Sequence, residues 1–247
     1  MTVWNPGVVG PLTIVRDSAS GDPERDLLGG VDLLQAVRSG HRGPTLRIYR
    51  PAPTMAFGQR DVRLEGYDDA VRLSRAAGFA PVVRKAGGRA AAYHRGTLIV
   101  DHAEPAGEAM LGHQARFQQL GELYAEALRS LAVDARVGEI PGEYCPGDFS
   151  VHGRPPASAP GGPVKLVGTA QRVVAGAWLF ASVFVVEDSE PLRRVLTDVY
   201  DALAMPLDPA TVGSVDDLVP GVTVSHVEDA LLSAYAAHLP LALPTGA

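Results

Sequence analysis

The chain contains a single cysteine, Cys145, in a segment where a backbone turn can present its thiol. Pro146 and Gly147 follow it directly, and both residue types are unfavourable inside a helix. Acidic residues lie close on either side, at Glu143 and Asp148. A thiolate is a strong nucleophile, and its thioester reacts with amines. Cys145 is therefore a candidate nucleophile, although a lone cysteine is more often a small buried apolar residue.

Lys165 is the candidate source of positive charge beside that thiol. It begins an apolar segment, and no other charged residue occurs before Arg172. A lysine that is partly removed from water at the start of a strand can stabilise a thiolate or a developing oxyanion. The alternative is an ordinary solvated surface lysine. His152 is a poor partner for Cys145, because an extended segment between them would span roughly 23 Å.

A Gly-Gly pair, Gly87 and Gly88, lies between two strand-like segments at 80–84 and 97–101. Glycines at such a position let backbone N–H groups come close to a bound ligand. The pair alone is a weak signal, because tight turns use it often. The histidines lack the close spacing that local metal sites use, so we expect no metal site.

The periodicity of apolar residues indicates the elements that must position these groups. It predicts helices over 27–37, 67–77 and 117–131, another beginning at Ser189, and a last one with a capping box of Ser225 and Glu228. It predicts strands over 46–50, 55–57, 80–84, 97–101 and 178–186. Gly29 and Gly30 weaken the first helix. Strands and helices interleave without a regular βαβ period, which favours one α+β domain over 1–247, a mixed β-sheet flanked by helices.

Composition excludes several classes of protein and partner. A hydrophobic fraction of 46% is normal for a packed protein, and a net charge of −6 disfavours nucleic acid and membrane surfaces as partners. The longest apolar stretch, 173–186, is shorter than the roughly 18 residues of a transmembrane helix. A single cysteine and the absence of a recognisable signal peptide favour the cytoplasm. The Pro/Gly-rich stretch 153–163 predicts an exposed or flexible loop.

Two segments resemble those of the lipoate/octanoate protein attachment family, which has the biotin/lipoate protein ligase fold. Arg84 to His94 is similar to the family's Arg-Arg-x-x-Gly-Gly-x-Ala-x-x-His loop. Lys165 to Arg172 is similar to its Lys-x-x-Gly-x-Ala-Gln-Arg segment, which supplies an active-site lysine. Segments 46–58 and 212–235 also match in order. The resemblance implies that Cys145 and Lys165 are catalytic and that these residues bind substrate: Arg84, Gly87, Gly88, Arg89, His94, Gly168, Thr169 and Ala170.

The family contains two chemistries, and three features favour one of them. Arg89 stands where ATP-dependent ligases usually have a third loop glycine. Cys145 to Phe149 resembles the Cys-Pro-Gly-Asp-Tyr segment of some cysteine-dependent transferases, and we expect none of the C-terminal accessory domain that the ligases often have. Two features depart from the family: Arg95 follows His94 where many relatives have Asp, and 153–163 separates the two motifs.

The resemblance thus implies an octanoyl or lipoyl protein transferase, an acyltransferase that needs neither metal nor nucleotide. Cys145 would carry the acyl group as a thioester, and Lys165 with N–H groups near Gly168 and Gly88 would stabilise the oxyanion. The acceptor would be a lysine of a lipoyl-domain protein, such as a dehydrogenase E2 subunit or the glycine cleavage H protein. An acyl-carrier protein or acylated H protein would be the donor. The alternatives are an ATP- and magnesium-dependent lipoate-protein ligase and a non-catalytic acyl binder.

Overall fold

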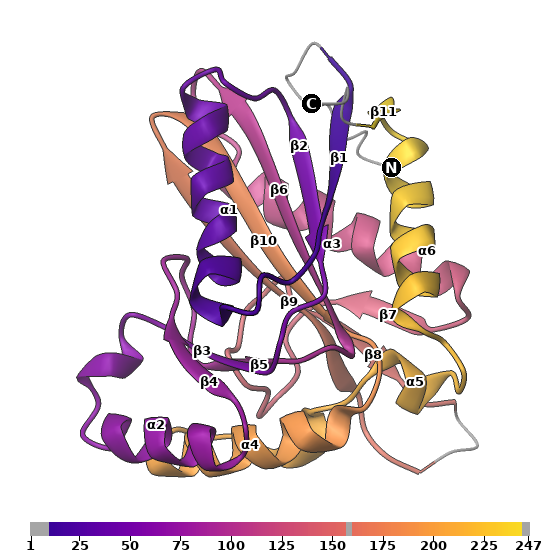
Figure 1. The fold of residues 1–247 in the computed structure, drawn as a ribbon. Helices are drawn as coiled ribbons and strands as arrows, with labels where there is room; N and C mark the ends of the chain where they lie inside the picture. Colours follow the sequence, from indigo (N-terminus) through magenta and orange to yellow (C-terminus); the bar gives the residue numbers. More distant parts are fainter. Residues whose placement is uncertain (1–9, 157–159, 244–247) are drawn as a thin grey trace.

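A computed structural model describes residues 10–156 and 160–243, which form two β-sheets and the helices around them (Figure 1). The large sheet has eight strands in the order β11-β1-β2-β6-β10-β9-β8-β7. Their bounds are β1 Leu12–Asp17, β2 Thr45–Tyr49, β6 Thr97–Ala106, β7 Asp134–Val137, β8 Val151–Arg154, β9 Val164–Val174, β10 Gly176–Val185 and β11 Leu241–Ala242. The sheet is mixed, because β1 pairs in parallel with β2 and β11 while β6, β10 and β9 pair antiparallel.

The small sheet supports the Gly-Gly segment. It consists of β4 (Ala80–Val83), β3 (Thr54–Phe57) and β5 (Ala91–Tyr93), in that order. Helices α2 (Tyr67–Ala76) and α4 (Ser189–Ala202) pack together beneath it, at the bottom of Figure 1. The Gly-Gly segment connects β4 to β5 and is therefore held at both ends by this sheet.

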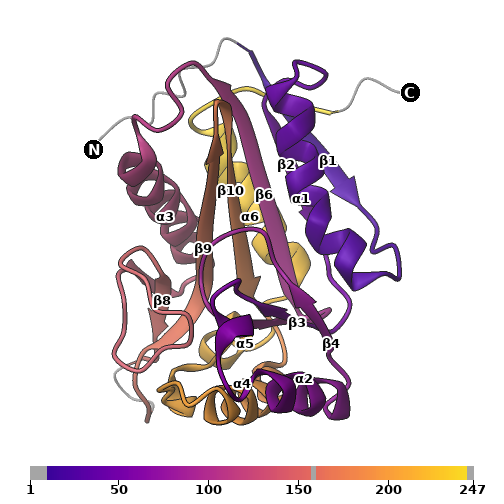
Figure 2. The same cartoon turned by 90° about the vertical axis from the view of Figure 1, so that its left-hand side faces the viewer.

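Helices cover both faces of the large sheet. Helix α1 (Pro23–Arg38) lies on one face, against β6 and β10. Helices α3 (His113–Ser130) and α6 (Val224–Ala236) lie on the other face, as the edge-on view in Figure 2 shows. A short helix α5 (Val215–Leu218) precedes α6. The predicted α+β class, a mixed sheet flanked by helices, is confirmed.

The alternation of β6 gives the two faces different chemistry. The carboxylate of Asp101 faces α1, because a Cβ on Gly30 of that helix would lie 2.9 Å from it. His102 faces the opposite way and contacts Tyr235 of α6. Successive residues of a strand point to opposite faces of the sheet, so neighbouring polar residues reach separate environments.

Most predicted elements are present, and their ends differ for local reasons. The last helix has a capping box of Thr223 and His226, so the predicted box of Ser225 and Glu228 is wrong. Thr223 has the extended backbone that a cap requires, whereas Ser225 already lies inside the helix. The prediction also missed β1, β5, β7, β8 and β11, which are mostly short. Short strands with mixed residue types carry little periodic signal.

The stretch predicted as a loop begins inside a strand. Gly153 and Arg154 belong to β8, which pairs with β7 and β9, and 157–159 lie outside the described residues. No helix in the described ranges is long and apolar enough to cross a membrane. Within those same ranges, no group of three or more His, Cys, Asp or Glu side chains is placed to hold a metal ion.

Candidate active site

A cavity lies between α1, the face of the large sheet and the loop that precedes β5. Its apolar lining comes from helix and strand residues, including Leu27, Val31, Ile99, Leu179, Ala181 and Val183. Its polar lining includes Arg84, Asp101, Cys145, Lys165 and Thr169. A mostly apolar cavity with a few convergent polar groups is typical of a small-molecule site. The cavity thus combines an apolar lining with a thiol, as a site for an apolar chain attached at that thiol requires.

The backbone presents Cys145 in an unusual conformation. Its φ is +43°, in the left-handed region that non-glycine residues seldom adopt. Its N–H donates to the hydroxyl of Tyr200 at 2.6 Å, and that hydroxyl donates to the carbonyl of Ala90 at 2.9 Å. Tyr200 therefore ties the Cys145 turn to the segment that enters β5. No sequence motif marked this tyrosine, which lies on α4 among ordinary core residues.

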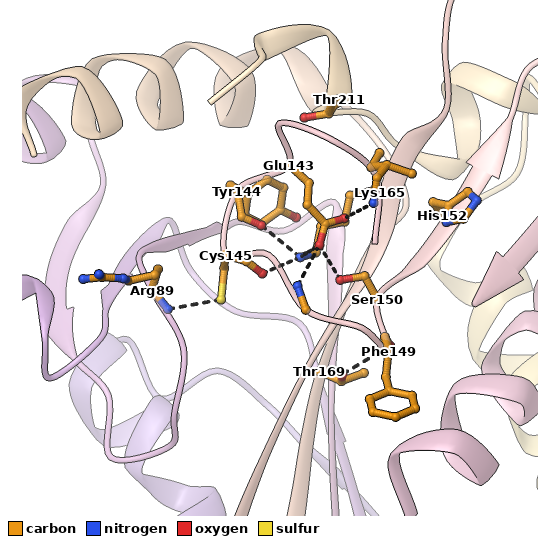
Figure 3. Close-up of polar contacts among 12 residues, drawn as sticks. Arg89, Glu143, Tyr144, Cys145, Phe149, Ser150, His152, Lys165, Thr169 and Thr211 are labelled. Carbon is orange, nitrogen blue, oxygen red and sulfur yellow. Dashed lines mark hydrogen bonds and ion pairs between the residues drawn. The ribbon is translucent and has the colours of Figure 1, made fainter. Parts of the chain in front are cut away.

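The thiol of Cys145 lies against positive charge and a backbone donor. Its Sγ accepts a hydrogen bond from the N–H of Arg89 at 3.1 Å (Figure 3). It accepts another from Nη2 of Arg84 at 3.5 Å. Burial raises the pKa of the Cys145 thiol, but the charges of Arg84 and Lys165 and the N–H of Arg89 outweigh it and lower the pKa below its ordinary value. The thiolate is therefore more accessible here than in an ordinary cysteine.

Gly88 allows this close approach. Its φ is +103°, and a Cβ at this position would lie 2.8 Å from the Sγ of Cys145 and 2.3 Å from Nη2 of Arg84. A side chain would therefore displace the groups around the thiol. Gly87 is different, because a Cβ there would meet nothing within 4 Å. Of the two glycines, Gly88 is the one that the site requires.

Lys165 is almost completely buried, with a relative exposure of 1%, so the alternative of a solvated surface lysine is wrong. Its Nζ donates to the carboxylate of Glu143 at 3.0 Å. It also donates to the carbonyls of Tyr144 at 2.9 Å and Cys145 at 2.8 Å. These bonds use all three donors of the ammonium group. Lys165 holds the backbone of the Cys145 turn and places a positive charge near the thiol (Figure 3).

Glu143 organises the turn from the other side. Its buried carboxylate accepts from the hydroxyl of Ser150 at 2.6 Å and from the N–H of Gly147 at 3.2 Å, in addition to Lys165. A buried carboxylate that accepts several hydrogen bonds fixes the groups around it. The sequence showed Glu143 close to Cys145, but only the structure shows that Glu143 pairs with Lys165.

Arg89 has two separate roles. Its N–H contacts the thiol of Cys145, whereas its guanidinium forms an ion pair with Asp61 at 2.9 Å. Asp61 is fully buried and also accepts from the N–H of Gly58 at 2.8 Å. The side chain of Arg89 is thus directed to Asp61, which neutralises its charge.

The remaining predicted site residues divide into two groups. Gly168, Thr169 and Ala170 line the cavity beside Lys165. His94 instead lies in the turn between β5 and β6, where its ring accepts from the N–H of Gly96 at 2.9 Å and contacts the carbonyl of Asp188 at 2.8 Å. Arg84, Cys145 and Lys165 also line the cavity, whereas Gly88 and the N–H of Arg89 adjoin the thiol. Gly87 and His94 are not among the lining residues. His152 contacts the carbonyl of Gly138 at 3.0 Å.

Solved structures of similar fold include structures of lipoate protein ligases. A Thermoplasma acidophilum protein with bound lipoic acid superposes with a TM-score of 0.71 at 20% identity, covering 95% of this chain and 88% of that chain. A lipoate-protein ligase A bound with ATP gives a TM-score of 0.68 at 20% identity, covering 96% of this chain and 90% of that chain. At such identity the similarity establishes the fold.

Sequence comparison identifies the family. An octanoyl-GcvH:protein N-octanoyltransferase of Geobacillus kaustophilus is 30% identical over 58% of this chain and 48% of its own length. One from an Exiguobacterium species is 27% identical over 78% of this chain and 69% of its own length. The chain thus spans about half the length of the first relative. The profile of the lipoyl protein ligase A/B catalytic domain matches residues 31–236. The chain therefore belongs to the lipoyl protein ligase A/B catalytic domain family.

Proposed function

We propose that the protein is an octanoyl or lipoyl protein transferase that carries the acyl group on Cys145. The observation that carries this proposal is the thiol itself, which lies in the cavity between Arg84 and the N–H of Arg89 with a lowered pKa. The names of the octanoyltransferase relatives support transfer of an octanoyl group.

The reaction proceeds in two half-reactions. The thiolate of Cys145 attacks the acyl carbonyl of the donor, forms the Cys145 thioester and expels the donor's thiolate, or its amine after protonation. An acceptor lysine amine then attacks this thioester, forms an amide, loses a proton and releases the thiol of Cys145. Each attack places negative charge on the carbonyl oxygen, and the charges of Arg84 and Lys165 together with the Arg89 N–H stabilise it.

The proposed partners follow from the relatives and from this chemistry. The relatives' name specifies an octanoyl group on GcvH as the donor, and a structural neighbour was solved as part of a system with an E2 lipoyl domain. We therefore take a lipoyl-domain protein, the glycine cleavage H protein or a dehydrogenase E2 subunit, as the acceptor. An acylated H protein or an acyl-carrier protein is the donor.

ATP-dependent ligation is the second candidate, because one structural neighbour was solved with bound ATP. In that case Arg84, Lys85 and Arg89 would contact the phosphate of an acyl-adenylate. Two contacts weigh against it. The guanidinium of Arg89 already pairs with Asp61, and its backbone N–H faces the thiol. We therefore propose that transfer needs no ATP or magnesium.

Intact-mass measurement tests the proposal. The protein is mixed with octanoyl-carrier protein without ATP, and an octanoyl adduct of about 126 Da is expected on the wild type but not on Cys145→Ala. Adding an acceptor lipoyl domain should discharge the adduct and acylate the acceptor. Formation of octanoyl-AMP from free octanoate and ATP would overturn the proposal in favour of the ligase. An acyl chain that binds without any turnover would favour the non-catalytic alternative.

A further inference from the structure

A buried ion pair of Arg47 and Asp101 adjoins the cavity, and Asp101 is one of the residues that line it. Nη1 of Arg47 donates to Oδ2 of Asp101 at 2.8 Å, and both residues are buried. Nε of Arg47 donates to Asp17 at 2.6 Å, and Nη2 donates to the carbonyl of Asp26 at 3.1 Å. The guanidinium also lies 4.1 Å from the centre of the Tyr49 ring. All three donor nitrogens of Arg47 are thus occupied.

Strand register places this pair at the end of the path that an acyl chain would take. The cavity crosses from β9 to β10 to β6, where Ala170, Ala181 and Asp101 are successive partners in register. Lys165, next to the Cys145 turn, is also on β9. Arg47 pairs in register with Asp101 on the next strand, β2. The cavity therefore begins beside Cys145 and reaches Asp101, with Arg47 directly behind.

The two glycines of α1 make room for the ion pair. A Cβ on Gly29 would lie 2.8 Å from Cζ of Arg47, and a Cβ on Gly30 would lie 2.9 Å from Cγ of Asp101. Gly30 also lines the cavity. Glycines inside a helix cost stability relative to alanine, so this helix accepts a local penalty where the charged groups pack against it. The packing closes the cavity between α1 and the sheet.

An ion pair at the end of the cavity is more rigid than apolar side chains would be. Leucine or methionine can change rotamer to admit one more methylene group. Arg47 cannot move in this way, because displacing it would leave Asp101 as an unpaired buried charge. A chain that is too long would meet a fixed, desolvated carboxylate instead of an adaptable apolar surface.

We propose that the Arg47–Asp101 pair is the end wall of the acyl site and sets the longest chain that the protein accepts. Arg47 and Asp101 are thus specificity-determining residues. The proposal rests on the proposed function only in that the occupant is an acyl chain attached at Cys145.

The wall can be moved outward without leaving a buried charge unpaired, because Asp17, the other acidic partner of Arg47, is exposed to solvent. The double variant Arg47→Met/Asp101→Ala removes both charges and takes the carboxylate out of the end wall. Proteins often tolerate the replacement of a buried ion pair by uncharged side chains. We expect the rate of Cys145 acylation with decanoyl thioester, relative to octanoyl thioester, to rise about tenfold. The measurement is intact-mass kinetics with a series of saturated acyl thioesters of one small thiol.

The wall can also be moved inward. Ala181 pairs in register with Asp101 and also lines the cavity. The larger side chain of Ala181→Val should shorten the cavity and raise the rate of Cys145 acylation with hexanoyl thioester, relative to octanoyl thioester, about tenfold. Glu104→Gln is the matched control, because Glu104 is on the same strand as Asp101 but on the opposite face of the sheet. Its chain-length profile should equal that of the wild type.

The chain-length profile is the rate of Cys145 acylation as a function of acyl chain length. The proposal would be overturned if both the folded double variant and Ala181→Val had the same profile as the wild type. If the double variant fails to fold, Ala181→Val alone decides: an unshifted profile places the wall elsewhere. Failure of the proposed function gives a different result, since the wild type would then form no thioester with any chain. The wall is tested in that case by calorimetric binding of free hexanoic, octanoic and decanoic acids to the same variants.

Discussion

Two buried polar clusters lie on the large sheet and the turns around it, and they differ in what surrounds them. The Cys145 cluster consists of Glu143, Cys145 and Lys165, with 3.0 Å between Oε1 of Glu143 and Nζ of Lys165. The His102 cluster consists of His102 and Glu104, with 2.9 Å between Nε2 and Oε1. Each cluster contains a buried glutamate bonded to a basic side chain.

The His102 cluster is formed by regular elements and covered by aromatic rings. Its two residues lie on β6, and the ring of His102 is 4.9 Å from Trp178 and 5.5 Å from Tyr235, centre to centre. In the Cys145 cluster, by contrast, Lys165 bonds to backbone carbonyls of an irregular turn, and the thiol adjoins the cavity. A buried hydrogen-bonded pair thus belongs to the packed core in one place and positions a reactive group in the other.

The largest effect that separates the two clusters is expected from the nucleophile. Cys145→Ala should lower acyl transfer by at least about a thousandfold, because no other thiol of the chain can form the thioester. Transfer from octanoyl donor to acceptor domain is measured by mass spectrometry, with thermal unfolding as the control for folding. Undiminished transfer by a folded Cys145→Ala protein would remove Cys145 from the mechanism.

Removal of the buried lysine is expected to have the next largest effect. Lys165→Met should lower the single-turnover rate by roughly a hundredfold to a thousandfold, about 3–4 kcal/mol, because the oxyanion and the turn lose their cation. Lys165→Arg should not restore the rate, since a planar guanidinium does not fit the same three acceptors.

Stability must be separated from rate in this experiment. Lys165→Met leaves Glu143 as an unpaired buried charge, which costs about 3–5 kcal/mol of folding free energy. The double variant Lys165→Met/Glu143→Gln removes that charge and should regain stability while transfer stays slow. A folded double variant with near-normal transfer would limit Lys165 to a structural role.

The pH dependence of thiol alkylation tests the charges around Cys145. The rate of alkylation by iodoacetamide should rise with pH and reach a plateau as the thiol ionises. Because the pKa of the thiol is lowered, the midpoint of this rise should lie below that of an ordinary cysteine. Arg84→Met removes a positive charge that favours the thiolate, so the midpoint should move upward by about one pH unit. Arg84→Lys retains the charge and should move it less. An unchanged midpoint in Arg84→Met would assign the lowered pKa to other groups.

The smallest effect on rate is expected in the His102 cluster. Glu104→Gln keeps the size of the side chain but removes its charge, and the unfolding free energy should fall by about 1–3 kcal/mol through the weakened bond to His102. Acyl transfer should stay within about twofold of the wild type. A tenfold loss of transfer at unchanged stability would show that the two faces of the sheet are coupled, and the comparison above would fail.

Features that depend on a single local segment could be predicted from the sequence. The uncharged run after Lys165 indicated a lysine at the edge of the core, and the lysine is buried. The fold class followed from the order of periodic segments and from the family resemblance. These features depend on neighbours in sequence, which is why a single sequence reveals them.

The contacts between distant segments could not be predicted in the same way. Tyr200, Asp61 and Glu143 reach the site from α4, from the turn after β3 and from the loop before Cys145. Gly29 and Gly30 looked like weak points of a helix, whereas they give space to a charged pair from β2 and β6. His94 occupies the position of the histidine in the family's glycine loop, but its ring contacts the carbonyl of Asp188 and not the cavity. Tertiary packing decides such pairings, and it leaves no periodic trace in the sequence.

The lowered pKa of the one thiol also has a consequence for oxidative stress. A thiolate is the form of cysteine that peroxides attack, and the first product is a sulfenic acid. A neighbouring cysteine can trap that product as a disulfide, but this chain contains no second cysteine. Recovery of oxidised Cys145 therefore depends on a thiol from outside the chain, and without one the oxidation proceeds to irreversible sulfinic and sulfonic acids.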